Sequence, residues 1–394
     1  MSAQRTVQIL KGQEPSNPNN AERDMQTLFT HLGLSLPIPI QSMEHRCEDS
    51  DTKIVKTFHI KPEDWIQYWM NTQPNLLGGH HGDAFENFHA FWKVYELQHG
   101  DHNVFTEHRN RLHRVVPLLL HGDEGRAVKR SNYLVMSMET PFGSVPDNTL
   151  KGCSCHEELA ARPDWPSYGS DSGSLPPEIL QVARGQLTNY KGHSYLSRWL
   201  LFGAGGWLYK KHPHIVDVVT EEIVASLISL FYQGVMTNDG QPIFAAVCHI
   251  KGDMDFHKKM MRLTRCYANL GRVAEIEICH HCKAGGPTCK FEDYQDEPQW
   301  ANTMYLNRPW DTDDVPPLSK LPYNASCPEK LLAGDLFHIH KLGIGRDVVG
   351  GVLIVLLRKG FFDYEGSSTN IVDRFNRSYN MFSLWCKVEK KRRV

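Results

Sequence analysis

The sequence predicts an α/β protein with large loop insertions, preceded by a mainly helical N-terminal lobe. Two apolar runs, at residues 115–120 and 243–250, are short and bounded by turn residues, as is typical of buried strands. Between them an amphipathic helical pattern places five apolar residues on one face: Ile215, Val219, Ile223, Leu227 and Leu230. Strands that alternate with helices in this way favour an α/β core.

Composition narrows the class of protein. The chain has 394 residues, which is enough for two domains or for one large domain with insertions. No apolar run is long enough to cross a bilayer, and the first residues lack the apolar region of a signal peptide. We therefore expect a soluble protein, nuclear or otherwise intracellular, that does not enter a membrane. The 10 cysteines are expected to be reduced thiols or metal ligands rather than a disulfide scaffold.

The N-terminal part divides into a lead and a lobe. Residues 1–20 are polar and rich in Asn and Pro, which predicts a disordered lead. Residues 21–110 form the expected lobe, with a strand at 55–60 and a helix that begins at Pro62. Four aromatic residues repeat at helical spacing, and such a stripe is usually core: Phe85, Phe88, Trp92 and Tyr95.

The predicted core spans residues 111–360. Further strands are expected at 132–138 and 198–202, and the amphipathic helix should stop at Gly234. A helix is predicted at 255–270, and a last, strongly apolar one from Asp335 onward. Residues 141–180 and 279–330 are loop-like and too long for ordinary connections, so we interpret them as insertions. Residues 361–394 are the expected C-terminal tail, whose basic end at 390–393 is either a nuclear-localisation or phosphate-contact patch or simply solvated.

Three aspartates, each preceded by glycine, are the candidate catalytic residues. Asp123 and Asp253 end the two apolar runs, and Asp335 opens the last helical pattern. Carboxylates hold Mg²⁺ or Mn²⁺ together with waters and substrate phosphate oxygens, and two such ions about 4 Å apart serve phosphodiester chemistry. Each aspartate also has an ordinary structural interpretation, as a helix N-cap or as part of a turn. Convergence of all three side chains, within about 8 Å, would favour the metal site.

The segments around these aspartates resemble the catalytic core of DDE/DDD transposases, most closely the eukaryotic CACTA-like and Plavaka-like elements. Residues 230–240 contain a Gly-Val pair followed by an Asp-Gly turn, and the next strand ends at Asp253. Asp335-Leu336-Phe337-His338, with Gly343 downstream, is similar to that family's third motif. The strand that ends at Asp123 and the strand after it resemble the first, and a Cys-x-x-Cys pair follows the second aspartate. The resemblance covers roughly residues 111–359.

The resemblance implies a ribonuclease-H-like mixed sheet with flanking helices, and divalent-metal-dependent DNA cleavage and strand transfer. Asp123 would bridge two Mg²⁺ or Mn²⁺ ions, with one ion each on Asp253 and Asp335. His338 would orient the third carboxylate, contact the scissile phosphate, or pack. The implied partner is DNA, at transposon ends, with a homo-oligomer or a separate DNA-binding module. Where the family often has Pro-Glu after the second aspartate, this chain has Met254-Asp255, which makes Asp255 a rival ligand.

Two other classes of function remain open. One is a catalytically inactive, transposon-derived protein that keeps the fold and binds DNA or protein. The other is an unrelated metal hydrolase, which would need His121, His249 and His338 to cluster around a metal. The formal charge of −2 counts against generic DNA binding, so DNA binding would need local basic faces or a separate module. Basic residues expected near the aspartates are Arg126, Lys129, Arg130, Lys258, Lys259, Arg262 and Lys341.

A cluster of cysteines and histidines forms a candidate zinc site. Cys279 and Cys282 make a Cys-x-x-Cys pair, and Cys289 with His281 or its neighbour His280 would complete a tetrahedral set. The alternative is a group of free thiols in a loop. A second cluster, at residues 153–156, is weaker.

Overall fold

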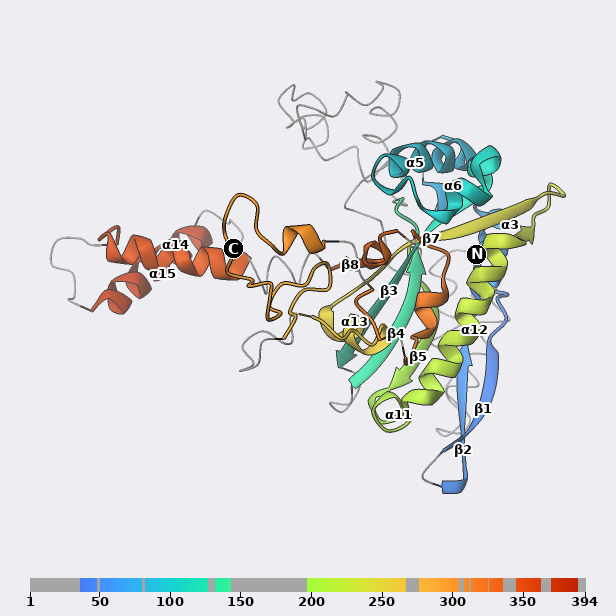
Figure 1. The fold of residues 1–394 in the computed structure, drawn as a ribbon, viewed down its shortest axis with the longest axis horizontal. Coiled ribbons are helices and arrows are strands. Elements are labelled where there is room, and N and C mark those ends of the chain that lie inside the picture. The colour runs from blue at the N-terminus through green and yellow to red at the C-terminus, as the bar shows by residue number, and fades with distance from the viewer. Residues whose placement is uncertain are drawn as a thin grey trace. The chain divides into compact units, whose positions relative to one another are not determined.

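The computed structural model describes residues 36–47, 50–79, 82–126, 132–142, 197–266, 276–304, 308–311, 313–324, 326–335, 345–362 and 370–388. These residues form an eight-stranded mixed sheet with flanking helices, which confirms the predicted α/β class (Figure 1). The expected N-terminal lead, most of the first insertion, His338 and the basic end of the chain lie outside the described residues.

The sheet has the strand order β1-β2-β5-β4-β3-β7-β6, and β8 also pairs with β7. Pairing is antiparallel for β1 with β2, β2 with β5, β4 with β5 and β6 with β7, whereas β7 and β8 are parallel. The strands are β1 (Gln41–Cys47), β2 (Ser50–His59), β3 (Val115–Arg126), β4 (Asn132–Glu139), β5 (Trp199–Gly205), β6 (Val235–Met236), β7 (Pro242–Gly252) and β8 (Leu332–Gly334).

The helices lie between and after these strands. They are α3 (Pro62–Thr72), α4 (Asn75–Gly78), α5 (Ala84–His99), α6 (Asn103–Glu107), α11 (Gly206–Lys211), α12 (Pro213–Tyr232), α13 (Met254–Met260), α14 (Gly345–Arg358) and α15 (Ile371–Val388). No helix in the described ranges combines the length and apolarity that a membrane span requires.

The chain divides into two compact units. The first contains residues 1–119, 124–247 and 320–323, and the second contains residues 120–123, 248–319 and 324–394. Strands β3 and β7 contribute residues to both units. All three Gly-Asp pairs, at 122–123, 252–253 and 334–335, belong to the second unit.

The first unit joins the expected N-terminal lobe to the first strands of the core. Its lobe is not only helical, because the hairpin of β1 and β2 belongs to the sheet. The aromatic stripe is core at Phe88 and Trp92, which are fully buried, whereas Phe85 and Tyr95 are half-buried. The Trp92 indole N–H donates to the Val115 carbonyl at 2.8 Å. Helix α12 begins at Pro213, and the chain leaves it at Gly234, whose φ of 69° is accessible to glycine at little cost.

The second unit departs from prediction in its helices. Helix α13 ends at Met260, so the prediction of a helix through residue 270 was wrong for residues 261–266. Arg262 breaks it with a φ of 47°, and its guanidinium pairs with Asp314 at 2.9 Å. The predicted irregular stretch after residue 279 contains only short 3-10 turns among its described residues, η5 (Ala301–Thr303), η6 (Pro317–Lys320) and η7 (Pro328–Leu331).

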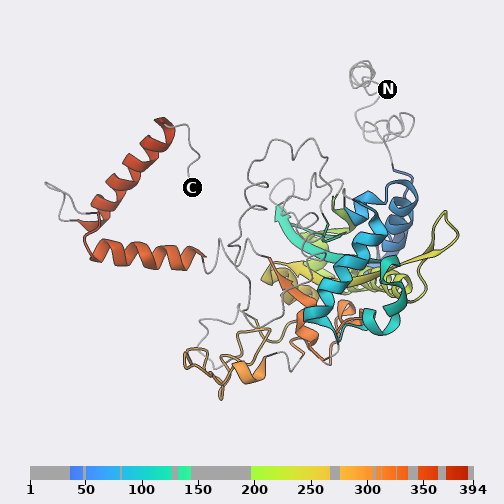
Figure 2. The ribbon, with the colours of Figure 1, turned by 90° about the horizontal axis from the view of Figure 1, so that it is seen from above.

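Two successive helices, α14 and α15, follow in the second unit and are red in Figure 2. The expected C-terminal tail therefore contains a helix. Several apolar side chains of α14 are more than half exposed, among them Val348, Val349 and Val352. A Cβ atom added at Gly350 or Gly351 would meet no atom within 4 Å. The apolar character of this helix, which is evident from sequence, is thus not matched by burial.

Candidate functional site

The three Gly-Asp pairs lie on three neighbouring strands. Gly252 of β7 and Gly334 of β8 are partners in the parallel ladder, and the Asp335 N–H donates to the Gly252 carbonyl at 3.2 Å. On its other side β7 neighbours β3, where a Cβ atom added at Gly252 would lie 2.9 Å from the Gly122 carbonyl oxygen. The prediction that the Asp123 and Asp253 strands are neighbours in one sheet is confirmed. We call these three adjacent Gly-Asp pairs, at 122–123, 252–253 and 334–335, the Gly-Asp edge.

The glycines of the edge are required by close packing and not by a turn. A Cβ atom at Gly122 would lie 1.8 Å from a ring carbon of Phe256, and one at Gly252 would lie 2.4 Å from another. Phe256 belongs to α13 and is 1% exposed, so its ring cannot move aside. Neither glycine has a positive φ. A side chain at either position would therefore clash with the ring that covers both strands.

Asp123 lies inside its strand, because β3 continues to Arg126, whereas the sequence pattern placed it at the strand end. Successive side chains of a strand point to opposite faces, so Asp123 projects on the face opposite Phe256. Its side chain is exposed. A carboxylate in this position is accessible to solvent, to a cation or to a substrate.

Asp253 has the structural role that its sequence context also allowed. It is the N-cap of α13, and its Oδ1 accepts a hydrogen bond from the Phe256 N–H at 2.7 Å. A carboxylate offers about four lone-pair positions, so this bond leaves acceptor capacity. The rival Asp255 lies in the first turn of α13 and is exposed. Capping and metal binding are compatible functions for Asp253.

Asp335 directly follows β8, and residues 336–344, which come after it, are outside the described ranges. The predicted helix start at Asp335, and with it the role of His338, lies outside the described residues. What the structure establishes is the backbone position of Asp335, which is hydrogen-bonded to the residue that precedes Asp253.

Two histidines, His249 and His257, hold the chain that leads into Asp335. His249 Nδ1 is 2.8 Å from the Lys330 carbonyl oxygen, and His257 Nε2 is 3.1 Å from that of Ala333. Burial lowers the pKa of both histidines. Because a carbonyl only accepts, each ring donates through the nitrogen that faces it. The sequence reasoning missed His257, whose only signal is its position one helical turn after Asp253.

The Cys-x-x-Cys pair is assembled as the sequence suggests. The Cys279 and Cys282 thiols are hydrogen-bonded to each other, and the Cys279 sulfur accepts the His281 backbone N–H at 3.3 Å. Burial, and then the neighbouring Cys279, raises the pKa of the Cys282 thiol to about 11. Cys289 is buried too, and its carbonyl accepts from the Gly285 N–H at 2.7 Å, closing the loop.

Buried polar residues surround this loop. His280 is 4% exposed, and burial, then His281, His257 and Arg265, lowers its pKa to about 3. The Arg265 guanidinium donates to the His280 carbonyl at 3.3 Å. Glu329 is completely buried, burial raises its pKa, and neither carboxyl oxygen has a hydrogen-bond partner among the described residues. The sequence singles out His280 through its place between Cys279 and Cys282, but not Arg265 or Glu329, which are isolated along the chain.

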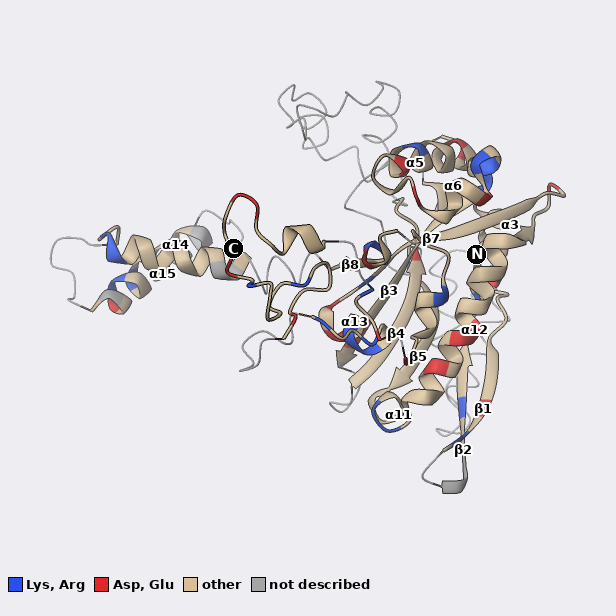
Figure 3. Cartoon of the chain, viewed as in Figure 1, with Lys and Arg blue, Asp and Glu red and all other residues tan. Residues whose placement is uncertain are grey.

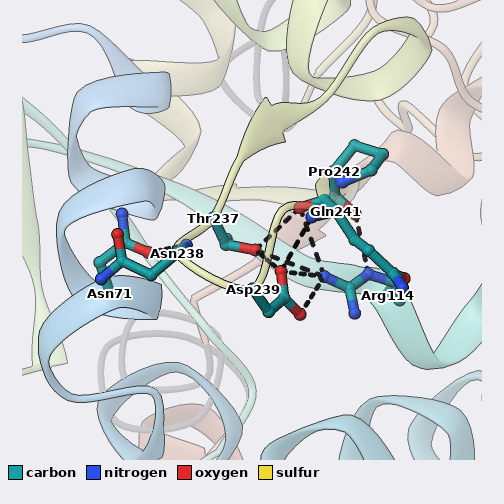
Figure 4. Close-up of polar contacts among 7 residues, drawn as sticks. All are labelled: Asn71, Arg114, Thr237, Asn238, Asp239, Gln241 and Pro242. Carbon is teal, nitrogen blue, oxygen red and sulfur yellow. Dashed lines mark hydrogen bonds and ion pairs between the residues drawn. The ribbon is translucent and has the colours of Figure 1, made fainter.

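The Asp-Gly turn that precedes β7 belongs to the first unit, and polar contacts with neighbouring residues hold it in place (Figure 4). Asp239 accepts from the Thr237 hydroxyl, from the Gln241 N–H at 3.0 Å and from Arg114 at 2.9 Å. Arg114 also donates to the Pro242 carbonyl at 2.9 Å. Together, and with the Thr237 bond contributing most, these contacts lower the pKa of Asp239 to about 2. This aspartate fixes a hairpin turn.

Within the described residues, no group of three or more His, Cys, Asp and Glu side chains is arranged to hold a metal ion. Comparison of the chain with protein-family models, with curated proteins and with solved structures finds no match.

Proposed function

We propose that this protein is a transposase-like enzyme that cleaves and joins DNA with the help of divalent metal ions. The observation that carries the proposal is the Gly-Asp edge. Three aspartates from distant parts of the sequence follow glycines that lie side by side on β3, β7 and β8, within one compact unit. A turn or an N-cap accounts for a single aspartate but not for the presence of three Gly-Asp pairs side by side on neighbouring strands.

The strand order supports a ribonuclease-H-like sheet. β3, β4 and β5 are successive neighbours, the long helix α12 follows, and the chain then returns to β7 beside β3. The chain then leaves the sheet and returns as β8, which pairs in parallel with the other side of β7. This path places the strand of the first carboxylate next to the strand of the second, as the resemblance to transposase cores implies.

The donor atoms of the edge suit hard cations. Mg²⁺ is usually held by one or two carboxylates, with waters and substrate phosphates completing its shell, so three aspartates suffice for two ions. Such ions would activate a water or a 3′-hydroxyl and stabilise the leaving oxygen. The chain's own contribution is to place these carboxylates. The Phe256 N–H orients the carboxylate of Asp253. The hydrogen bond from the Asp335 N–H to the Gly252 carbonyl fixes the backbone of Asp335.

DNA is the partner that this chemistry requires, and a nuclear location would follow from it. Lys258 and Lys259 lie on the helix that Asp253 caps, and α13 carries basic residues in Figure 3. Arg262, expected near the aspartates, is paired with the exposed Asp314. Lys129, Arg130 and Lys341 lie outside the described residues. With a formal charge of −2, the chain would bind DNA through such local positive charge, and binding would weaken as salt rises.

We also propose a structural zinc ion on Cys279 and Cys282, with Cys289 or His281 among the remaining ligands. The support is the contact between the first two thiols and the burial of Cys282 and Cys289. Because the Cys282 thiol is protonated at neutral pH without a metal, zinc binding would release protons and weaken in acid. Elemental analysis of protein purified without chelator should find zinc that Cys282→Ser loses and Cys327→Ser, at a half-exposed thiol elsewhere in the unit, retains.

The enzymatic proposal is tested by cleavage and strand transfer of duplex DNA in Mg²⁺ or Mn²⁺. Asp253→Asn is the informative variant, because an asparagine side chain still accepts the capping hydrogen bond and only the charge is lost. It should abolish cleavage at an unchanged unfolding temperature, as should Asp123→Asn. Asp255→Asn is the matched control and should cleave normally.

Two outcomes would change this proposal, one in the function and the other in the identity of the second metal ligand. Wild-type protein that binds DNA but shows no metal-dependent cleavage would identify the catalytically inactive derivative as the better account. Activity that survives Asp253→Asn but is lost in Asp255→Asn would move the second metal ligand to Asp255.

A further inference from the structure

Three hydrogen bonds, together with the short chain segments between them, connect Asp253 to Asp335 in the second unit. The Asp253 carbonyl accepts the His257 N–H at 3.0 Å in the first turn of α13, and the His257 ring contacts the Ala333 carbonyl at 3.1 Å. Two residues after Ala333, the Asp335 N–H donates to the Gly252 carbonyl at 3.2 Å, directly before Asp253. The imidazole of His257 is the only side chain in this path.

The third carboxylate needs such an anchor because its strand is short. β8 comprises only Leu332–Gly334, so its parallel ladder with β7 has few hydrogen bonds to hold it. Ala333 is the central residue of this strand and pairs with Lys251. A hydrogen bond from a buried side chain to the Ala333 carbonyl therefore restrains the backbone two residues before Asp335.

The ring of His257 is suited to this role. It is 3% exposed, so the ring itself is shielded from solvent where it meets the half-buried Ala333. The contact requires a proton on Nε2, which leaves Nδ1 as the unprotonated nitrogen of the neutral ring. Burial, the largest influence, keeps the ring neutral by lowering its pKa. The carbonyl contact therefore fixes both the orientation and the tautomer of the ring.

We propose that His257 is a positioning residue that holds Asp335 beside Asp253 by anchoring β8 through the Ala333 carbonyl. This inference rests on the proposed function, since it assigns Asp335 to the metal-binding edge. His257 does not touch substrate or metal in this role. It acts through the backbone of the strand that leads into the third carboxylate.

The test compares His257→Leu with His257→Gln, because glutamine restores an N–H donor and leucine does not. The matched control is His249→Leu, which removes the same kind of bond farther from Asp335, at Lys330. Hydrogen exchange of the amides at 332–335 is measured in each full-length variant, together with the unfolding temperature and DNA cleavage. Losing the anchor should speed exchange at these amides by about tenfold in His257→Leu, at an unfolding temperature close to that of His249→Leu. Glutamine should restore slow exchange and cleavage.

The inference is overturned if exchange at 332–335 is unchanged in His257→Leu, if His249→Leu accelerates it equally, or if glutamine rescues neither exchange nor cleavage. Absence of cleavage by the wild-type protein would instead reject the proposed function. The exchange measurement then still decides whether His257 anchors β8, because it needs neither metal nor DNA.

Discussion

Gly122 and Gly252 have no room for a side chain, because the ring of Phe256 lies against both strands. Asp beside Gly is a common turn signal, but here the glycines let β3, β7 and α13 approach one another at the point where the aspartates emerge. The sequence shows that the glycines are present, but it does not show that packing against Phe256 requires them. Phe256 is distant along the chain from Gly122, and only the fold brings them together.

Gly122→Ala should destabilise the protein by about 1–3 kcal/mol, because the added methyl group overlaps a buried ring. Replacing Phe256 by leucine in the same chain should recover part of this loss, since the three atoms nearest to the added methyl group all belong to that ring. Gly252→Ala is the control: its Cβ also meets the Gly122 carbonyl, which cannot move aside, so Phe256→Leu should rescue it less. Denaturant unfolding of the single and double variants measures this. Equal rescue of both glycine variants would contradict the packing described.

At the scale of elements, the sequence predicts the central strands and the long helix well and the short elements poorly. β3, β4, β5 and β7 were predicted because their apolar runs are bounded by turn residues, and α12 because its apolar face repeats regularly. β8 has only three residues and no pattern of its own, and it is a strand because β7 pairs with it. Helix α13 is shorter than its periodicity suggests, since Arg262 turns away to pair with Asp314.

The hairpin turn before β7 gives a prediction at this scale. Asp239→Asn should lower the unfolding temperature at pH 7, because the asparagine keeps one acceptor but loses the ion pair with Arg114. The pKa of Asp239 is about 2 in the folded protein, below its ordinary value of 3.8. Its contribution is therefore fully present above pH 3.8 and is lost only as pH falls toward 2. The difference between wild type and variant should stay constant from pH 7 to pH 5.

Unfolding temperatures of both proteins across this range check the prediction, and Arg114→Met should remove part of the difference between Asp and Asn at position 239. A difference that disappears by pH 5 would contradict the assigned pKa.

At the scale of the whole molecule, buried histidines make the fold sensitive to acid. Burial lowers the pKa of eight histidines in the described structure: His45, His59, His89, His108, His249, His257, His280 and His281. For His108 and His280 the pKa falls to about 4 and about 3. The unfolded chain therefore takes up protons below pH 6.5 that the folded chain does not, so stability is lost as pH falls from 6.5 toward 4. Two carboxyl groups whose pKa burial raises, those of Asp64 and Glu329, act in the opposite direction.

We expect the unfolding temperature to fall steadily between pH 6.5 and pH 4, without a matching loss between pH 8 and pH 6.5. His108→Gln should flatten this dependence, because it removes one proton-binding group whose neutral ring donates to the Phe231 carbonyl at 2.7 Å. Calorimetry at a series of pH values measures both effects. An unfolding temperature that is the same at pH 7 and pH 4.5 would show that these rings do not titrate as described.

The central claim is that Asp123, Asp253 and Asp335 form one metal-binding edge, and it is tested most directly by counting bound metal ions. Titration of the full-length protein with Mn²⁺, followed by electron paramagnetic resonance, reports bound and free ions separately. We predict about two Mn²⁺ per chain in the wild-type protein and reduced binding in Asp123→Asn, Asp253→Asn and Asp335→Asn. Asp255→Asn should bind as the wild type does. Mn²⁺ binding that is absent from the wild type, or that survives all three substitutions, would contradict the account.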